Sequence, residues 1–242
     1  MSEPVTLLDG KVIARQSEAG FRSGLDAVLL GASIDLKPEH VGLEFGCGSG
    51  AAMLVAAWHN KVSRFQGFDT DAVMLGFADE NVAANGWQDR VVAFQADVLN
   101  PGHLGLVHQV FFNPPYYDNP KKMVPPKFQK QAAYMGHGVP LETWIRLANK
   151  VLVPKGRVTL IHRADRLDDI LMLMRKWFGD VVVKPVAPYA DQPAKRILVS
   201  ARKGVNGPMK LLPPLVLHDG SGRKYTAEAE SILRGSDRIE LR

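Results

Sequence analysis

Short apolar runs alternate with longer amphipathic stretches through most of this chain. The runs are rich in β-branched and aromatic residues and stop at Gly, Pro, Asn or Asp, which is typical of strands. The predicted core strands, about seven in all, are Val41–Phe45, Phe65–Phe68, Val91–Phe94, Val110–Phe112, Arg157–Ile161, Val181–Val183 and Arg196–Ala201. Strands interleaved with helices pack as a mostly parallel sheet with helices on both faces, so the pattern predicts an α/β fold.

Apolar residues recur at a spacing of three and four between these runs, which predicts helices. Two of the helices are expected over Ala51–Trp58 and about Ala72–Asn85. Two further apolar stripes are Leu141, Trp144, Ile145, Ala148 and Leu152, and then Leu167, Ile170, Leu171, Met174, Trp177 and Phe178. Between the two stripes, Pro154-Lys155-Gly156 predicts a turn.

The N-terminal segment is expected to form a small cap beside the sheet. Val5–Ala14 alternates weakly around Asp9-Gly10, a good hairpin signal. Ser23 and Asp26 have the spacing of a capping box at the start of a helix. We therefore expect one domain over residues 1–242, with a cap (1–38), a core (39–203) and a C-terminal extension (204–242).

Composition limits the kind of protein. The 242 residues are 46% hydrophobic, enough for a sizeable core. No apolar run approaches the ~20 residues that span a bilayer, and the N-terminus lacks a signal-peptide pattern, so we expect a cytoplasmic protein without membrane contact. Cys47 stands alone, which excludes an internal disulfide, and no metal-ligand cluster is visible. Nothing in the sequence specifies an oligomeric state.

Charge is divided unequally along the chain. Residues 1–120 hold 7 Lys/Arg and 14 Asp/Glu, a balance of −7, whereas residues 121–242 hold 23 and 11, a balance of +12. A solvated basic surface would account for part of this. Segregation of this size nevertheless favours a polyanionic partner, because phosphate contacts supply much of the affinity for nucleic acid.

A glycine-rich segment, Glu44-Phe45-Gly46-Cys47-Gly48-Ser49-Gly50, connects a predicted strand to a predicted helix. Glycines at such a point allow a tight turn and a close approach of the backbone to a ligand, although a structural turn alone would also use them. The next strand ends at Asp69, whose carboxylate can accept hydrogen bonds from ribose hydroxyls. The third strand leads to Asp97, which can accept from an adenine amino group. The sequence therefore predicts a nucleoside cofactor at this edge of the sheet.

The tetrapeptide Asn113-Pro114-Pro115-Tyr116 follows the fourth core strand. The prolines could simply end the strand, but they do not explain the polar Asn and the aromatic residue. The side-chain carbonyl of Asn113 and the backbone carbonyl of Pro114 offer two acceptors for the two N–H bonds of a planar amino group. Tyr116 can stack on a base. The motif thus favours chemistry on an exocyclic or amide nitrogen.

The two motifs together resemble those of class I S-adenosylmethionine (AdoMet) methyltransferases that modify such nitrogens. More narrowly, the chain is similar to the bacterial tRNA(Val) adenine-N6-methyltransferase family. The likeness extends over almost the whole chain, including Arg22–Leu30, Asn81–Gly86, Pro193–Val199 and Pro214–His218. It differs where members often carry Arg-His-Glu, replaced here by Ala133–Gly138, and at Asp69, where members often carry Glu.

The resemblance implies a Rossmann-like fold and AdoMet as methyl donor, with a tRNA adenine N6 as acceptor. It implies catalytic roles for Asn113, Pro114 and Tyr116, and a role for the Asp26 segment in closing the cofactor pocket. The cofactor-binding residues expected on the same basis are Glu44, Gly46, Gly48, Gly50, Asp69 and Asp97.

Residues 117–140 form a long aperiodic segment beside the predicted reaction site. Such segments are usually functional, and we expect its lysines, together with Arg196 beside the last strand, to contact substrate phosphates. Those lysines are Lys121, Lys122, Lys127 and Lys130. A solvated surface loop is the alternative.

Three other functions stay open from the sequence. A protein glutamine amide presents the same planar NH2, and guanine N2 is a close variant of adenine N6. A non-catalytic module that binds AdoMet and RNA is the third, although the intact Asn113 and Tyr116 count against it.

Overall fold

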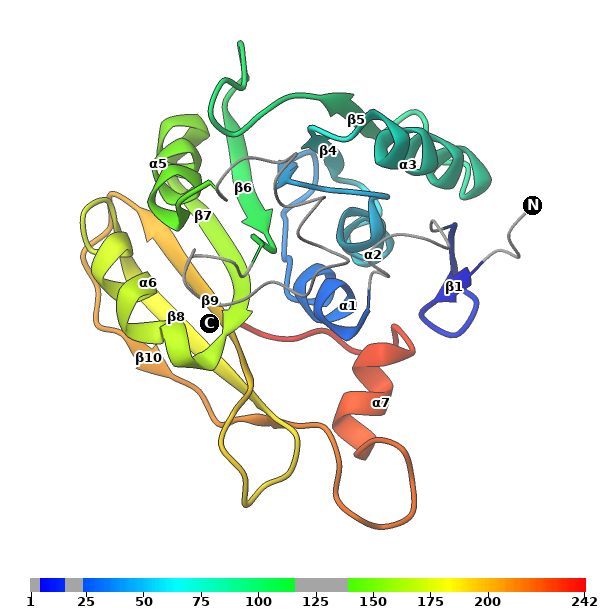
Figure 1. Cartoon of the computed structure of the whole chain (residues 1–242), viewed down its shortest axis with the longest axis vertical. Helices are drawn as coiled ribbons and strands as arrows, with labels where there is room; N and C mark the ends of the chain where they lie inside the picture. Colours follow the sequence, from blue (N-terminus) through cyan, green and yellow to red (C-terminus); the bar gives the residue numbers. More distant parts are fainter. Residues whose placement is uncertain (1–4, 16–23, 116–138) are drawn as a thin grey trace, which may run out of the picture.

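The computed structural model describes residues 5–15, 24–115 and 139–242. A large sheet runs through the molecule, and a separate two-stranded hairpin lies beside it (Figure 1). The hairpin pairs β1 (Val5–Leu7) with β2 (Val12–Ala14) in antiparallel register, which confirms the hairpin predicted around Asp9-Gly10.

The large sheet has the strand order β10-β8-β9-β7-β6-β3-β4-β5, and β11 also pairs with β8. Its strands are β3 (Val41–Phe45), β4 (Arg64–Asp69), β5 (Val91–Gln95), β6 (Val107–Phe112), β7 (Leu152–Arg163), β8 (Phe178–Ala187), β9 (Arg196–Lys203), β10 (Lys210–Leu211) and β11 (Leu215–Val216). All pairings are parallel except the two made by β9. The mostly parallel sheet predicted from the sequence is therefore confirmed.

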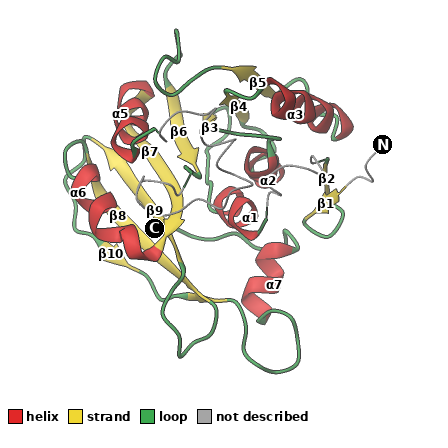
Figure 2. Cartoon of the chain, in the orientation of Figure 1, coloured by secondary structure: helices red, strands yellow, loops and turns green. Residues whose placement is uncertain are grey.

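Helices cover both faces of the sheet (Figure 2). The helices are α1 (Leu25–Ala32), α2 (Ala51–His59), α3 (Ala72–Ala84), α5 (Leu141–Val151), α6 (Leu167–Met174) and α7 (Ala227–Leu233), with a short 3-10 turn at Ala164–Arg166 before α6. One apolar core joins α1, α2 and α7 to one face, and a second joins α5 and α6 to the other. In the described part of the chain, no helix is long and apolar enough to cross a bilayer.

Several predicted boundaries differ from the structure, including those at Leu152, which begins β7, and at Trp177, which follows α6. Phe178 belongs to β8 rather than to the preceding helix, because its backbone pairs with Lys203 of β9. Pro154-Lys155-Gly156 lies within β7, where the register against β6 shifts and Lys155 has φ of +63°. Helix α1 has Gly24 at its N-cap without a side-chain cap, and Ser23 lies outside the described residues.

Candidate active site

Parallel pairing brings three of the predicted site residues to one edge of the sheet. Phe45, the last residue of β3, pairs with Phe68 of β4 on one side and with Phe112 of β6 on the other. The residues that follow these three are Gly46, Asp69 and Asn113. Neighbouring strands lie about 4.8 Å apart, so the glycine loop stands between a carboxylate and the Asn-Pro motif.

Left-handed backbone shapes the glycine loop. Gly46, Gly48 and Gly50 have φ of +63°, +52° and +81°, a region that other residues adopt only with strain. The N–H of Cys47 donates to the carbonyl of Phe68 at 2.9 Å, which fixes the loop to the end of β4. The loop then leads into α2, with Gly50 as the N-cap of that helix.

Glu44 is buried directly beneath this loop and is 4% exposed. Burial raises the pKa of its carboxyl well above the ordinary value, and the nearby Asp69 raises it further, against a hydrogen bond from the N–H of Met53. Among the described residues, neither its Oε2 nor the buried Oγ of Ser49 has a hydrogen-bond partner. Buried polar atoms without partners are rare, so these two atoms are available to a polar ligand at the loop.

Cys47 lies in the same loop with a buried thiol. Burial raises the pKa of the thiol well above its usual range, and the carboxyls of Glu44 and Asp69 raise it further. Because the thiolate is the nucleophilic form, this environment makes Cys47 a small apolar filler of the loop.

Two of the three acidic residues predicted to bind the cofactor, Asp69 and Asp97, already accept hydrogen bonds from backbone N–H groups. Asp69 accepts from the N–H of Gly48 at 2.8 Å and from the N–H of Asp71 at 3.0 Å. Asp97 accepts from the N–H of Leu99 at 2.9 Å. A carboxylate offers about four acceptor positions, so each retains capacity for a hydroxyl or amino group of a ligand.

Asn113 and Pro114 lie at the end of β6, half-buried and buried respectively. Trp144 of α5 packs close by, with its ring centroid 5.5 Å from that of Phe112. Its indole contacts the glycine loop, because a Cβ on Gly46 would lie 3.0 Å from the Trp144 ring. The aromatic packing therefore supports the Asn-Pro motif and the glycine loop together.

Five predicted residues lie outside the described part of the chain. They are Tyr116, Lys121, Lys122, Lys127 and Lys130. Arg196, the fifth residue expected to contact substrate phosphates, is described. Its Nε donates to Asp26 at 2.9 Å, so this guanidinium ties the first turn of α1 to the start of β9.

Asn81 is a residue of the site that the sequence reasoning missed as a functional group. It lies in α3, is 0% exposed, and holds Arg15 of the hairpin through both backbone groups, at 2.5 and 3.0 Å. Its Nδ2 also donates to the carbonyl of Ser49 at 3.0 Å. The segment Asn81–Gly86 belongs to the family resemblance, but that resemblance gave Asn81 no role. Asn81 thus joins the N-terminal hairpin to the glycine loop.

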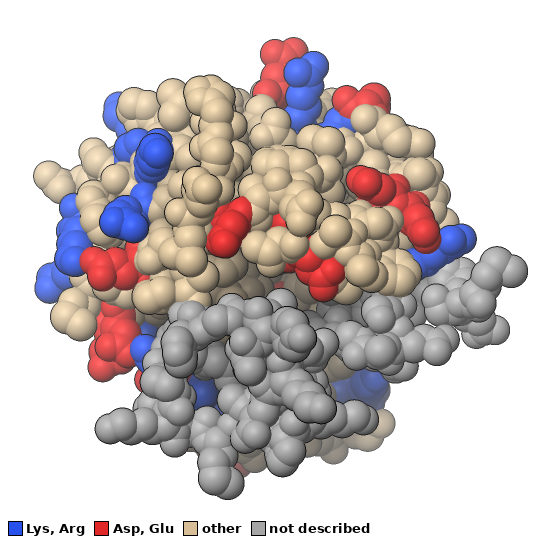
Figure 3. Space-filling model, turned by 45° about the horizontal axis from the view of Figure 1, so that its top comes forward, with Lys and Arg blue, Asp and Glu red and all other residues tan. Residues whose placement is uncertain are grey.

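The edge as a whole fits a nucleoside-bearing cofactor with a cationic group. The glycine loop admits a ligand close to the backbone, and the two partnerless atoms offer it polar contacts. On the face drawn in Figure 3, most Lys and Arg side chains lie on the side of α5 and α6, whereas Asp and Glu lie mainly toward the middle and α3. On this face, the charge division along the chain is therefore also a division between two sides of the molecule.

Comparison with known proteins agrees with this geometry. The model of the methyltransferase small domain matches residues 25–185. A Dickeya chrysanthemi protein named tRNA1(Val) (adenine(37)-N6)-methyltransferase is 30% identical over 227 residues, which cover 88% of this chain and 87% of that protein. A Porphyromonas gingivalis protein of the same name is 33% identical over 165 residues, or 64% of each chain.

A solved structure from Agrobacterium tumefaciens, described as a predicted O-methyltransferase, superposes with a TM-score of 0.73 at 23% identity, over 89% of this chain and 98% of that one. At that identity the likeness concerns the fold alone. The family model, by contrast, matches most of this sequence, and its match contains both motifs. The chain belongs to the methyltransferase small-domain family.

Proposed function

We propose that this protein transfers the methyl group of AdoMet to the exocyclic N6 of an adenine in tRNA. The observation that carries the proposal is the adjacency of the Asn113-Pro114 pair to the glycine loop at the ends of β6 and β3. A planar amino group gripped by the first would lie beside a cofactor bound by the second. Positioning of this kind supplies most of the rate acceleration when no strong base is needed.

The cofactor would be held by residues from three strand ends. Glu44 presents a buried carboxyl with a partnerless oxygen, which suits the ammonium of the methionine moiety. Asp69 would accept from the ribose hydroxyls, and Asp97 from the adenine amino group. The backbone of Gly46, Gly48 and Gly50 would allow close approach.

AdoMet supplies an electrophilic methyl group on a sulfonium. The amide oxygen of Asn113 and the carbonyl of Pro114 would accept the two N–H bonds of the target amine, which concentrates its lone pair on the nitrogen. The amine nitrogen so held would form its bond to the methyl carbon as the S–C bond breaks, with the electron pair of that bond staying on sulfur, and would then release one proton to solvent. Tyr116, outside the described residues, would stack on the adenine.

A tRNA substrate is supported by the names of the relatives and by charge. Both relatives described above are named for a tRNA adenine, and the C-terminal half of the chain carries a balance of +12. Lys121, Lys122, Lys127 and Lys130 would meet phosphates beside the reaction site. Because tRNA is a cytoplasmic molecule, the same proposal assigns the protein to the cytoplasm.

The test is an assay with isotope-labelled AdoMet and separate pools of tRNA, rRNA, DNA and protein from a strain without the enzyme. Products would be digested and identified by mass spectrometry. Label in N6-methyladenosine from tRNA is the expected result. Label in methylglutamine or in N2-methylguanosine would replace the acceptor named here, and no transfer to any pool would overturn the proposal.

A further inference from the structure

A second surface lies farther along the same edge of the sheet, past β7 and β9. It consists of Tyr189, Lys195, His218, Arg223, Lys224 and Tyr225, and we name it the basic aromatic corner. Strand β8 runs parallel to β6 and β7 through its antiparallel pairing with β9, so its carboxyl end lies on the same side as Asn113. The corner and the candidate active site therefore open on one edge.

Aromatic rings at the corner are ordered and partly open to solvent. Tyr189 is 40% exposed, and it is the one aromatic residue among the large exposed hydrophobic side chains of the described chain. Its ring centroid lies 5.4 Å from that of His218, which stacks on Tyr225 at 5.4 Å and 19°. The N–H of His218 donates to the carbonyl of Pro188 at 2.9 Å, which joins the ends of β8 and β11. The rings are thus held in place before any ligand arrives.

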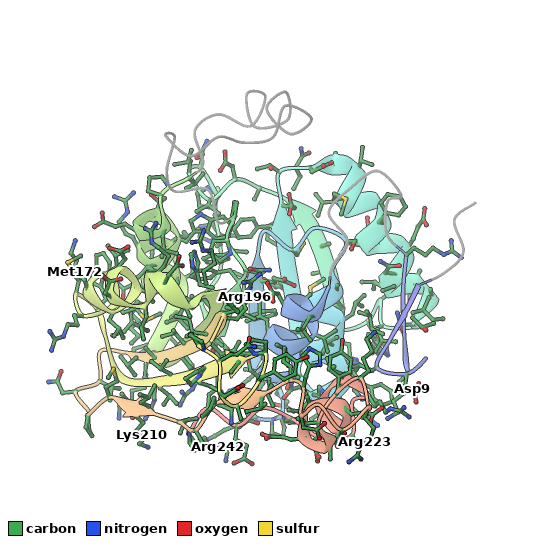
Figure 4. All side chains as sticks on the ribbon, turned by 60° about the horizontal axis from the view of Figure 1, so that its bottom comes forward. Asp9, Met172, Arg196, Lys210, Arg223 and Arg242 are labelled. Carbon is green, nitrogen blue, oxygen red and sulfur yellow. The ribbon has the colours of Figure 1, made fainter. Side chains whose placement is uncertain are left out.

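Positive charge surrounds the rings. The Nζ of Lys224 lies 5.4 Å from the ring centroid of Tyr225, and Lys195 is exposed beside β9. The two loops that carry the corner, residues 188–196 and 217–225, hold four Lys/Arg and two Asp/Glu, a balance of +2. Figure 4 shows Arg223 on the loop before α7 and Lys210 of β10 on opposite sides of the view, with Arg196 near its centre.

A hollow of about 410 Å³ adjoins the corner, since Lys195 belongs to both. The start of α1 and the ends of β8 and β11 line it, and its charged lining residues are Lys195, Arg196 and Asp26. Arg196 and Asp26 form an ion pair at 2.9 Å, so Lys195 is the cation of the lining without an acidic partner in the same lining. Apolar walls with a cationic rim suit a nucleobase attached to a phosphate.

We infer that the basic aromatic corner binds a single-stranded stretch of the substrate RNA next to the methylated adenine. Tyr189 stacks on a base of this stretch, and Lys195 and Lys224 contact its phosphates. The inference rests on the proposed function, because it names a further contact for the same RNA. Three strand spacings of about 4.8 Å separate β8 from β6, so the contact lies a few nucleotides from the target.

The test measures binding of an unmodified tRNA transcript by fluorescence anisotropy, without AdoMet, for wild type and for four variants. Tyr189→Ala is expected to weaken binding roughly 5- to 150-fold, the range for loss of one stacked base, whereas Tyr189→Phe keeps the wild-type value. Lys195→Ala is expected to weaken binding and reduce its salt dependence. Lys210→Ala serves as the control, because Lys210 lies away from the corner, and it is expected to keep wild-type binding.

AdoMet affinity, measured by calorimetry, should stay unchanged in all four variants. If wild type binds and methylates tRNA but Tyr189→Ala equals wild type in both, the corner inference fails and the proposed function stands. If wild type binds no RNA, both fail. If the corner variants lower methylation of a protein and not of RNA, the corner is a protein-docking surface and the inference is overturned.

Discussion

Single side chains at the candidate site act through burial as much as through contact. Glu44 is a carboxyl that the folded chain keeps at 4% exposure with one oxygen partnerless. Such a group destabilises the protein in its ionised form, so its retention calls for a compensating role. Binding a cationic ligand group is the role that the account gives it, because an opposite charge favours the ionised carboxyl.

Glu44→Gln is expected to change the stability of the protein and its affinity for AdoMet in opposite directions. Because burial raises the pKa of Glu44, the folded protein holds a proton that the unfolded chain releases above about pH 4.5. Stability therefore falls as pH rises from that value toward the folded-state pKa, and the variant should escape this loss. We expect its Tm to exceed that of wild type by a few degrees at pH 8 and to match it at pH 4.

AdoMet affinity of the same variant should fall about 10- to 100-fold, the range for one charge-assisted hydrogen bond. Calorimetry of both proteins at pH 8 measures this difference. Equal AdoMet affinity in the two proteins would contradict the role given to Glu44.

At the scale of the elements, helix α2 begins at the glycine loop, and helix α1 packs closely against α2. Gly31 of α1 faces α2 so closely that a Cβ there would lie 2.5 Å from the carbonyl oxygen of Ala52 and 2.6 Å from Cβ of Val55. Gly76 of α3 has open space at the same position of its backbone. Both glycines lie within helices and differ in the space around them, so the same substitution at Gly76 is a control for Gly31.

We expect Gly31→Ala to destabilise the protein by about 1–3 kcal/mol, the usual cost of overpacking, since α2 begins at the glycine loop and cannot shift freely. Gly76→Ala should stabilise it by roughly 0.5–1 kcal/mol through helix propensity. Urea unfolding at pH 7 measures both. A stabilised Gly31→Ala would mean that α1 and α2 pack less tightly than the structure has them.

Asn81 and Asn85 form a second such pair, on α3. Both hold the hairpin, since Asn85 binds Ile13 through Oδ1 and Nδ2 at 3.0 and 2.7 Å, but only Asn81 also reaches the carbonyl of Ser49. Asn81→Ala should therefore lower AdoMet affinity about 10-fold, whereas Asn85→Ala leaves it within about threefold. Both should lose stability. Equal AdoMet affinities in the two variants would refute the link between hairpin and loop.

At the scale of the whole molecule, the sequence predicted the elements with strong periodicity. All seven predicted core strands are present, and the family indicated by the two motifs is confirmed. The two-residue strands β10 and β11 and the helix α7 were not predicted, because such short elements have no period and form only by pairing with β8 or packing on α1.

At the candidate site, too, the sequence predicted some arrangements and not others. The order of strands predicted that Gly46, Asp69 and Asn113 share an edge, since carboxyl ends of parallel strands lie together. Side-chain contacts between residues far apart in the sequence could not be predicted from the pattern of strands and helices. The ion pair of Arg196 with Asp26 joins residues 170 positions apart, and local spacing carries no information on such a contact.

The most direct measurement is the initial rate of N6-methyladenosine formation in tRNA by wild type and by Asn113→Ala, together with the tRNA affinity of each protein. Removing one of two acceptors for the target amine should lower the rate about 100-fold or more and leave tRNA affinity within about threefold. Wild type should produce N6-methyladenosine in tRNA alone among the nucleic acids. Full activity of Asn113→Ala, or product from wild type in another acceptor, would contradict the account.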